Sequence, residues 1–86
     1  MATAFLMLET EQEGVDFLID ILDEQDLERI PKRWQVIEHL LEGETHRSVQ
    51  KITGASSYMI SRASRMVVKQ GTGISEVIWK RLKRDL

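Results

Sequence analysis

The sequence predicts an all-α protein built from five or six short helices. Apolar residues recur every three or four positions, no segment alternates with the period of two that marks a strand, and glycines separate the helical stretches. The 86 residues are 42% hydrophobic and 30% charged with one proline, which is the composition of a folded helical chain. We therefore expect a single domain over residues 1–86.

Two amphipathic stretches are predicted in the amino-terminal half. Between Glu11 and Asp23 one apolar stripe holds Val15, Leu18, Ile19 and Leu22. Residues 27–42 repeat this spacing through Trp34, Ile37 and Leu41. Pro31 fits the first turn of a helix that follows a short helical turn, and it fits equally a kink in one continuous helix. Gly43 is expected to end this stretch.

The carboxy-terminal half is predicted to hold three more helical segments. Residues 45–53 form a short one that Gly54 stops, and Ser56 is a suitable N-cap for a helix from Ser57 to about Gln70. The run Gly71-Thr72-Gly73 breaks that helix, and residues 74–86 form the last one.

Charge is distributed unevenly along the chain. Residues 1–26, an acidic N-terminal helix region, hold eight acids and no lysine or arginine, whereas residues 45–86 hold nine bases and two acids. The basic half is suited to a polyanion. Two solvated faces that neutralise each other are the alternative interpretation.

Residues 45–70 fit a helix-turn-helix, in which two short helices pack around a tight turn and the second helix enters the major groove. With Gly54 as the turn residue, the expected apolar anchors fall on Val49, Ala55, Ile60 and Ala63. Gln50 departs from the pattern, because a small residue usually stands where the two helices touch.

The second of these helices separates an apolar face from a cationic one. Ile60, Ala63 and Val67 share one side, and the nearly opposite side contains no acid. We predict base contacts from Ser57, Tyr58 and Ser61, and phosphate contacts from cations on both helices. The predicted DNA-binding residues are Arg47, Lys51, Ser56, Ser57, Tyr58, Ser61, Arg62, Arg65 and Lys69. Ordinary solvated surface is the alternative.

The run RWQVIEHLLEGETHRSVQKITGASSYMISRASRMV, followed by GTG, resembles the tryptophan repressor superfamily and more closely its YerC/YecD branch. The residues that match the branch are Arg33, Leu40, Leu41, Gly43, Thr53-Gly54-Ala55-Ser56 and Ile60-Ser61-Arg62. Departures at Ser48, Ser57-Tyr58-Met59 and Ala63-Ser64 lie at the tip of the reading head. They imply a different operator, or a loss of specific binding.

The resemblance implies an intertwined, TrpR-like homodimer in which each subunit presents one helix-turn-helix. The wide apolar stripes agree, because a thin subunit of this length has more apolar surface than it can bury. The predicted dimer core is Phe17, Leu18, Ile21, Leu22, Trp34, Ile37, Leu40, Leu41 and Trp79. A compact monomer is the alternative.

The resemblance also implies a ligand site. In the tryptophan repressor two arginines hold the amino-acid corepressor, and Arg33 and Arg62 are their counterparts here. Asp23, Ala63 and Met66 replace a threonine, a glycine and a serine, and the last two substitutions narrow the slot for an indole. An amino-acid corepressor is therefore compatible with the resemblance, while tryptophan is disfavoured. Structural salt bridges or phosphate binding by the two arginines are the alternatives.

The sequence contains no recognisable catalytic or metal-ligating motif. His39 and His46 lie on separate predicted elements, and Gly71-Thr72-Gly73 lacks the lysine of a phosphate-binding loop. The chain has no cysteine, no cleavable signal pattern and no apolar run of about 20 residues, so a cytoplasmic location without a membrane partner is expected.

We therefore predict a non-enzymatic, sequence-specific transcription repressor that binds double-stranded DNA as a helix-turn-helix homodimer and needs no cofactor. The main alternative is a dimeric protein-interaction module whose degenerate helix-turn-helix docks a protein partner. A third hypothesis is an enzyme subunit or antitoxin that holds an acidic partner with its basic half.

Overall fold

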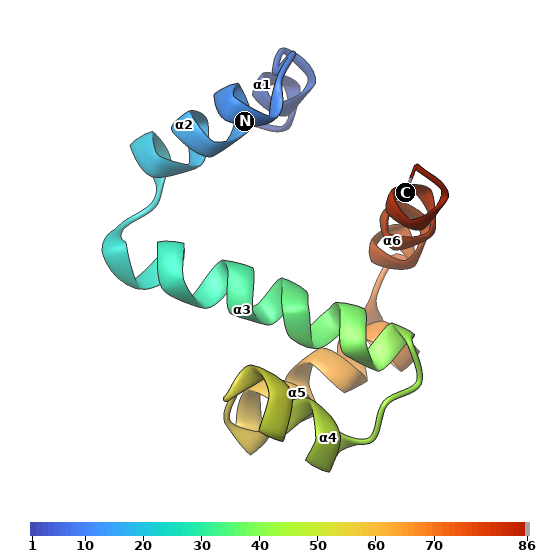
Figure 1. The fold of residues 1–86 in the computed structure, drawn as a ribbon. Helices are drawn as coiled ribbons and strands as arrows, with labels where there is room; N and C mark the ends of the chain where they lie inside the picture. The colour runs from blue at the N-terminus through green and yellow to red at the C-terminus, as the bar shows by residue number, and fades with distance from the viewer. Residues whose placement is uncertain (86) are drawn as a thin grey trace. The chain divides into compact units, whose positions relative to one another are not determined.

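A computed structural model of the chain describes residues 1–85, apart from the side chains of Lys69 and Gln70. It contains six α-helices and one π-helix, and the described residues include no strand (Figure 1). The elements are α1 (Ala2–Leu6), α2 (Glu11–Ile21), α3 (Glu24–Leu41), α4 (His46–Thr53), α5 (Ser57–Arg65), η1 (Met66–Gln70) and α6 (Ile74–Arg84). The predicted all-α class is confirmed. None of the described helices combines the length and the apolar character that a membrane crossing requires.

The chain divides into two compact units, Met1–Ile30 and Pro31–Leu86. In the first unit the rings of Phe5 and Phe17 meet edge to face, with centroids 5.3 Å apart, and so join α1 to α2. Thr10 caps α2, because its hydroxyl accepts a hydrogen bond from the Glu13 N–H at 3.1 Å. No side chain of residues 1–30 is fully buried within the chain.

The boundary between the units falls inside α3, at Pro31. The sequence was compatible with a short helical turn that ends before Pro31 and with one continuous helix. The structure has the continuous helix. Proline removes only one hydrogen bond from the helix, and the Asp23 carboxylate secures the first turn by accepting from the Asp26 N–H at 2.8 Å. Beyond Leu41 the chain leaves the helix through Gly43, at φ +88°.

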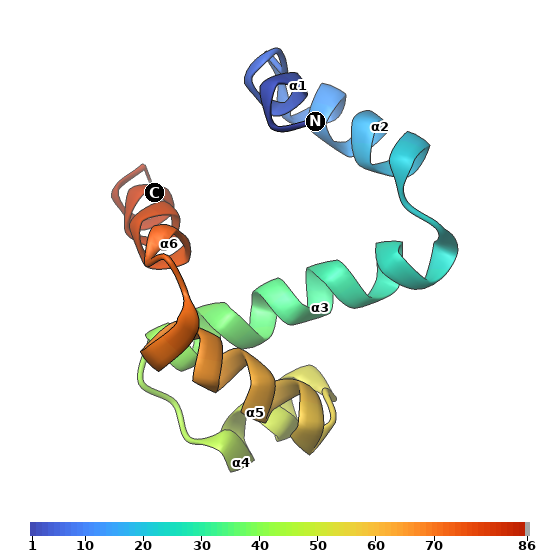
Figure 2. The same ribbon diagram turned by 180° about the vertical axis from the view of Figure 1, so that it is seen from behind.

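The core of the second unit is small and lies where three helices meet. Val36 and Ile37 of α3 pack with the predicted anchors of the following helices, and both Figures 1 and 2 show α4 and α5 beside the carboxy-terminal half of α3. All four anchors are buried: Val49, Ala55, Ile60 and Ala63 are at most 3% exposed. Each fully buried valine or isoleucine stabilises the fold by about 1.5–3 kcal/mol. This cluster fixes α5 against α4.

The turn between α4 and α5 has the predicted geometry. Gly54 adopts a left-handed conformation at φ +71°, and its N–H donates to the Gln50 carbonyl at 2.9 Å. Ser56 caps α5, because its hydroxyl accepts from the Met59 N–H at 3.1 Å. The larger side chain of Gln50 is accommodated because it is exposed and donates to the Ser57 hydroxyl at 3.3 Å.

The helix predicted from Ser57 to about Gln70 is not uniform. The α-helical part ends at Arg65, and η1 closes with a hydrogen bond from the Gly71 N–H to the Met66 carbonyl at 2.6 Å. A Cβ atom on Gly71 would lie 2.5 Å from that carbonyl oxygen, so no larger residue fits without a shift. Gly73, at φ +83°, then precedes α6.

Candidate nucleic-acid interface

Exposed cations are found on α4 and α5 of the second unit. Arg47 and Lys51 of α4 and Arg62 and Arg65 of α5 are all exposed. Residues 45–75 contain no aspartate or glutamate. Among the described side chains, none of these four cations forms an ion pair. We name these four residues the cationic face; their charges are free to neutralise phosphate groups.

A shallow groove lies between α4 and α5. It has a volume of about 210 Å³ and is lined by His46, Arg47, Gln50, Ser57, Ile60 and Ser61. Apart from the buried Ile60, its lining carries hydroxyl, amide, imidazole and guanidinium groups, which can hydrogen-bond to base edges and phosphates. The Gly54 turn, which ends α4, and the Ser56 cap, which starts α5, connect the two helices that line the groove.

A second, basic pocket gathers three guanidinium groups. We name it the arginine pocket: its volume is about 410 Å³, and Arg33, Tyr58, Arg62, Arg65 and Met66 line it. Arg62 Nη1 donates to the Tyr58 hydroxyl at 3.0 Å, and Arg33 Nη2 lies 3.7 Å from the Met66 sulfur. The lining contains no carboxylate, so the pocket is suited to an anionic ligand.

Arg62 perturbs the ionisation of the chain's only tyrosine. The hydrogen bond from Arg62 lowers the pKa of the Tyr58 hydroxyl, and the positive charges of Arg62 and Arg65 act in the same direction. The same hydrogen bond raises the pKa of the Arg62 guanidinium. The guanidinium also lies 5.7 Å from the centre of the Tyr58 ring, so the two side chains form one unit on the surface of α5.

Six of the predicted DNA-binding residues line one of the two hollows: Arg47, Ser57 and Ser61 line the groove, and Tyr58, Arg62 and Arg65 line the arginine pocket. The Ser56 hydroxyl is occupied by its cap hydrogen bond to Met59. The side chain of Lys69 lies outside the described residues. Sequence reasoning did not place His46 or Gln50 in the groove, nor Arg65 beside Arg33. The sequence could not predict that Arg33 and Arg65 lie together, because helical spacing relates Arg65 to Tyr58 but not to a residue of α3.

The residues predicted for a dimer core differ in their burial within one chain. Ile37 is 5% exposed and belongs to the chain's own core, and Trp34, Leu40 and Leu41 pack partly against it. Ile21 is 42% exposed. The other predicted members, which are half-buried, are Phe17, Leu18, Leu22 and Trp79.

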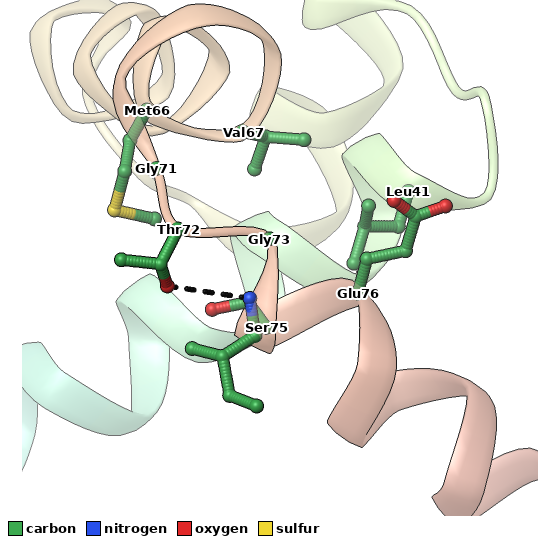
Figure 3. A pocket seen from close by; sticks show the side chains of 9 residues that line it. Leu41, Met66, Val67, Gly71, Thr72, Gly73, Ser75 and Glu76 are labelled. Atoms are coloured by element: carbon green, nitrogen blue, oxygen red, sulfur yellow. Dashed lines mark hydrogen bonds between the residues drawn. The ribbon is translucent and has the colours of Figure 1, made fainter.

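An apolar pocket of about 330 Å³ lies between η1, the end of α3 and the start of α6. Figure 3 shows Met66 and Thr72 on one side of it and Leu41 and Glu76 on the other. The Thr72 hydroxyl accepts from the Ile74 N–H at 3.3 Å and so holds the first turn of α6 (Figure 3). Mainly apolar groups line the pocket, which provides packing surface rather than reactive chemistry.

The described residues form an all-helical protein in which residues 45–75 carry the exposed cationic face and contain no acid. The chain belongs to the Trp repressor protein family, because the model of that family matches residues 1–82. Membership indicates a DNA-binding transcription regulator, in a family that is regulatory rather than enzymatic. Searches of curated proteins and of solved structures found no significant match.

Proposed function

We propose that the protein is a sequence-specific transcription repressor that binds double-stranded DNA as a homodimer through a helix-turn-helix formed by α4 and α5. The observation that carries this proposal is the cationic face, because it is presented by two helices whose mutual packing the buried anchors and the Gly54 turn define. A surface that only kept the protein soluble would be expected to mix charges of both signs. The YerC/YecD branch is the part of the family that we propose for it.

The two helices are assigned different roles at the DNA. The start of α5 enters the major groove, where Ser57, Tyr58 and Ser61 contact base edges. Arg47 and Lys51 of α4 contact phosphates on one side, and Arg65 contacts them on the other, together with Lys69. Ser56 contributes indirectly, because its cap hydrogen bond sets the direction in which α5 begins.

Exposed apolar residues on α6 support the homodimer. Ile74, Val77, Ile78 and Leu82 recur at helical spacing and are 38–54% exposed within one chain. In α2, Val15 and Ile19 are 45% and 54% exposed. Only six buried residues form the core of the described chain, which is few for 86 residues. A second copy of the chain would bury the exposed apolar residues of α2 and α6. Two reading helices then reach half-sites about 34 Å apart.

The arginine pocket supports an anionic effector as part of the same proposal. In this proposal Arg33 and Arg62 bind the carboxylate of the effector, which is supported by the position of both in one pocket with Arg65. Met66 lies in the lining and contacts Arg33, which leaves less apolar room for an indole. We therefore propose an amino acid or another small carboxylate other than tryptophan.

Selection from a random pool of DNA duplexes, followed by sequencing of the bound fraction, tests specific binding. The expected result is an enriched sequence with two-fold symmetry. Binding without an enriched sequence that disappears at higher salt contradicts the proposal and favours a dimeric protein-interaction module with a degenerate helix-turn-helix.

The salt dependence of affinity tests the assigned phosphate contacts. Lys51→Ala removes one contact per subunit, so the slope of log affinity against log salt concentration falls by about 1.8 for a dimer. Lys80→Ala is the matched control: it removes the same charge from α6, where Lys80 pairs with Glu76 at 3.2 Å, and it leaves the slope unchanged. Equal slopes for Lys51→Ala and the unmodified protein contradict the assigned role.

A further inference from the structure

The end of α3 gathers three metal-ligating side chains outside the DNA-binding surface. His39, Glu42 and Glu44 each offer one ligand atom, and these atoms all lie within 4.8 Å of one another. His39 Nδ1 contacts a carboxylate oxygen of Glu44 directly. The group is not a simple acidic patch, because it combines an imidazole nitrogen with two carboxylates.

The backbone holds this group together. Gly43 turns the chain at φ +88°, and the Glu44 N–H then donates to the His39 carbonyl at 3.2 Å. Glu44 is thereby fixed beside the last turn of the helix that carries His39. The side chains of His39 and Glu44 are about 30% exposed, so each loses little freedom when it binds a ligand.

The third member already attracts a cation. The Glu42 carboxylate pairs with the Lys83 ammonium group of α6 at 3.0 Å. Because this lysine is half-exposed and the pair is open to solvent, the ion pair is weak, and a divalent ion can replace the ammonium group. Lys83 retains a second contact when it is displaced, since its ammonium nitrogen lies 4.7 Å from the centre of the Trp79 ring.

We propose that His39, Glu42 and Glu44 form a binding site for a divalent first-row transition-metal ion such as Zn²⁺. One imidazole and two carboxylates are nitrogen and oxygen ligands that Zn²⁺ accepts, whereas Mg²⁺ and Ca²⁺ prefer oxygen ligands alone. Ligand atoms around one tetrahedral Zn²⁺ lie about 3.4 Å apart, so side-chain rotations bring the three atoms to the ion without a backbone change. Water completes the coordination.

The site has a structural consequence for the second unit. It joins the end of α3 to the connection that leads to Thr45, whose hydroxyl accepts from the Ser48 N–H at 3.1 Å and caps α4. A bound ion stiffens this connection and stabilises the folded chain. The inference concerns metal binding alone and does not rest on the proposed binding of DNA.

Isothermal titration calorimetry of the full chain with Zn²⁺ tests the site. We expect one ion per chain, and we expect His39→Ala to weaken binding by about 100-fold and Glu42→Gln by about tenfold or more. His46→Ala is the matched control, since His46 is the other histidine and lies outside the group. It is expected to bind Zn²⁺ like the unmodified protein. Mg²⁺ in place of Zn²⁺ should produce no saturable heat.

Co²⁺ provides a second measurement, because its visible absorption reports the ligands directly. The expected spectrum is that of a nitrogen- and oxygen-ligated ion, and it is lost in His39→Ala and kept in His46→Ala. If His39→Ala does not fold, the exposed Glu42→Gln decides the question. Zn²⁺ affinity that is unchanged in Glu42→Gln or His39→Ala overturns the site. The absence of saturable Zn²⁺ binding below about 1 mM also overturns it and leaves only the direct contact between His39 and Glu44.

Discussion

Truncation of Ile60 is expected to destabilise the second unit strongly, because this side chain lies at the centre of a very small core. Ile60 is 1% exposed and packs among Val36, Val49 and Ala63. Ile60→Ala removes three buried carbon atoms, which is worth about 2.4 kcal/mol of transfer free energy. Incomplete closure of the cavity raises the loss towards about 4 kcal/mol. A chain of this length has a total stability of about 4–13 kcal/mol, so the variant loses a large fraction of it.

Urea denaturation followed by far-UV circular dichroism measures this loss. The stability of Ile60→Val should lie between that of the unmodified protein and that of Ile60→Ala, with a loss of about 0.5–1.5 kcal/mol. Ile52→Ala is the matched control, since Ile52 is on α4 but 56% exposed, and it should cost less than about 1 kcal/mol. All variants are compared at one protein concentration, because a dimer's stability depends on it. Equal losses for Ile60→Ala and Ile52→Ala would refute the assignment of Ile60 to the core.

Two further expectations concern local structure. Gly71→Ala places a Cβ 2.5 Å from the Met66 carbonyl oxygen and should destabilise the chain by about 1–3 kcal/mol in thermal unfolding. Gly14→Ala is the control: its Cβ meets nothing within 4 Å in α2, and it should stabilise the chain by about 0.5–1 kcal/mol. A neutral effect of Gly71→Ala would show that η1 does not need the close approach of Gly71 to Met66. Ultraviolet titration of Tyr58 should show its pKa rising towards the ordinary value in Arg62→Ala, because both the hydrogen bond and the charge are lost, and rising less in Arg65→Ala, where only a charge is lost. Identical titration curves in all three proteins would contradict the hydrogen bond.

These experiments separate levels of the structure that depend on different interactions. The Ile60 series reports the core, Gly71→Ala reports the junction between α5 and α6, and the Tyr58 titration reports the surface of α5. If the Ile60 and Gly71 variants behave as expected but the Tyr58 titration does not, the protein has the described fold but not the described arrangement of arginines. The DNA selection would then still test Arg47 and Lys51, the two members of the cationic face that lie outside the arginine pocket.

The sequence by itself determined most of the local structure. The ends of the helices follow from glycines and capping residues whose partners lie within about four positions, as Gly54 and Ser56 show. The four anchors were predicted correctly from their positions relative to the turn at Gly54, and all four are buried. The uneven charge distribution also required only the sequence, and the T-G-A-S and I-S-R motifs led to the family.

Only the tertiary structure decided where distant side chains meet. The arginine pocket combines Arg33 of α3 with residues of α5 and η1, and no local spacing relates them. The sequence left open whether α3 continues through Pro31, and it did not predict the change from α5 to η1 at Met66. The contact of His39 with Glu44, by contrast, is local, because the left-handed turn at Gly43 joins residues only five positions apart. Short-range hydrogen bonds are specified by neighbours in the chain, whereas pockets are specified by the packing of whole helices.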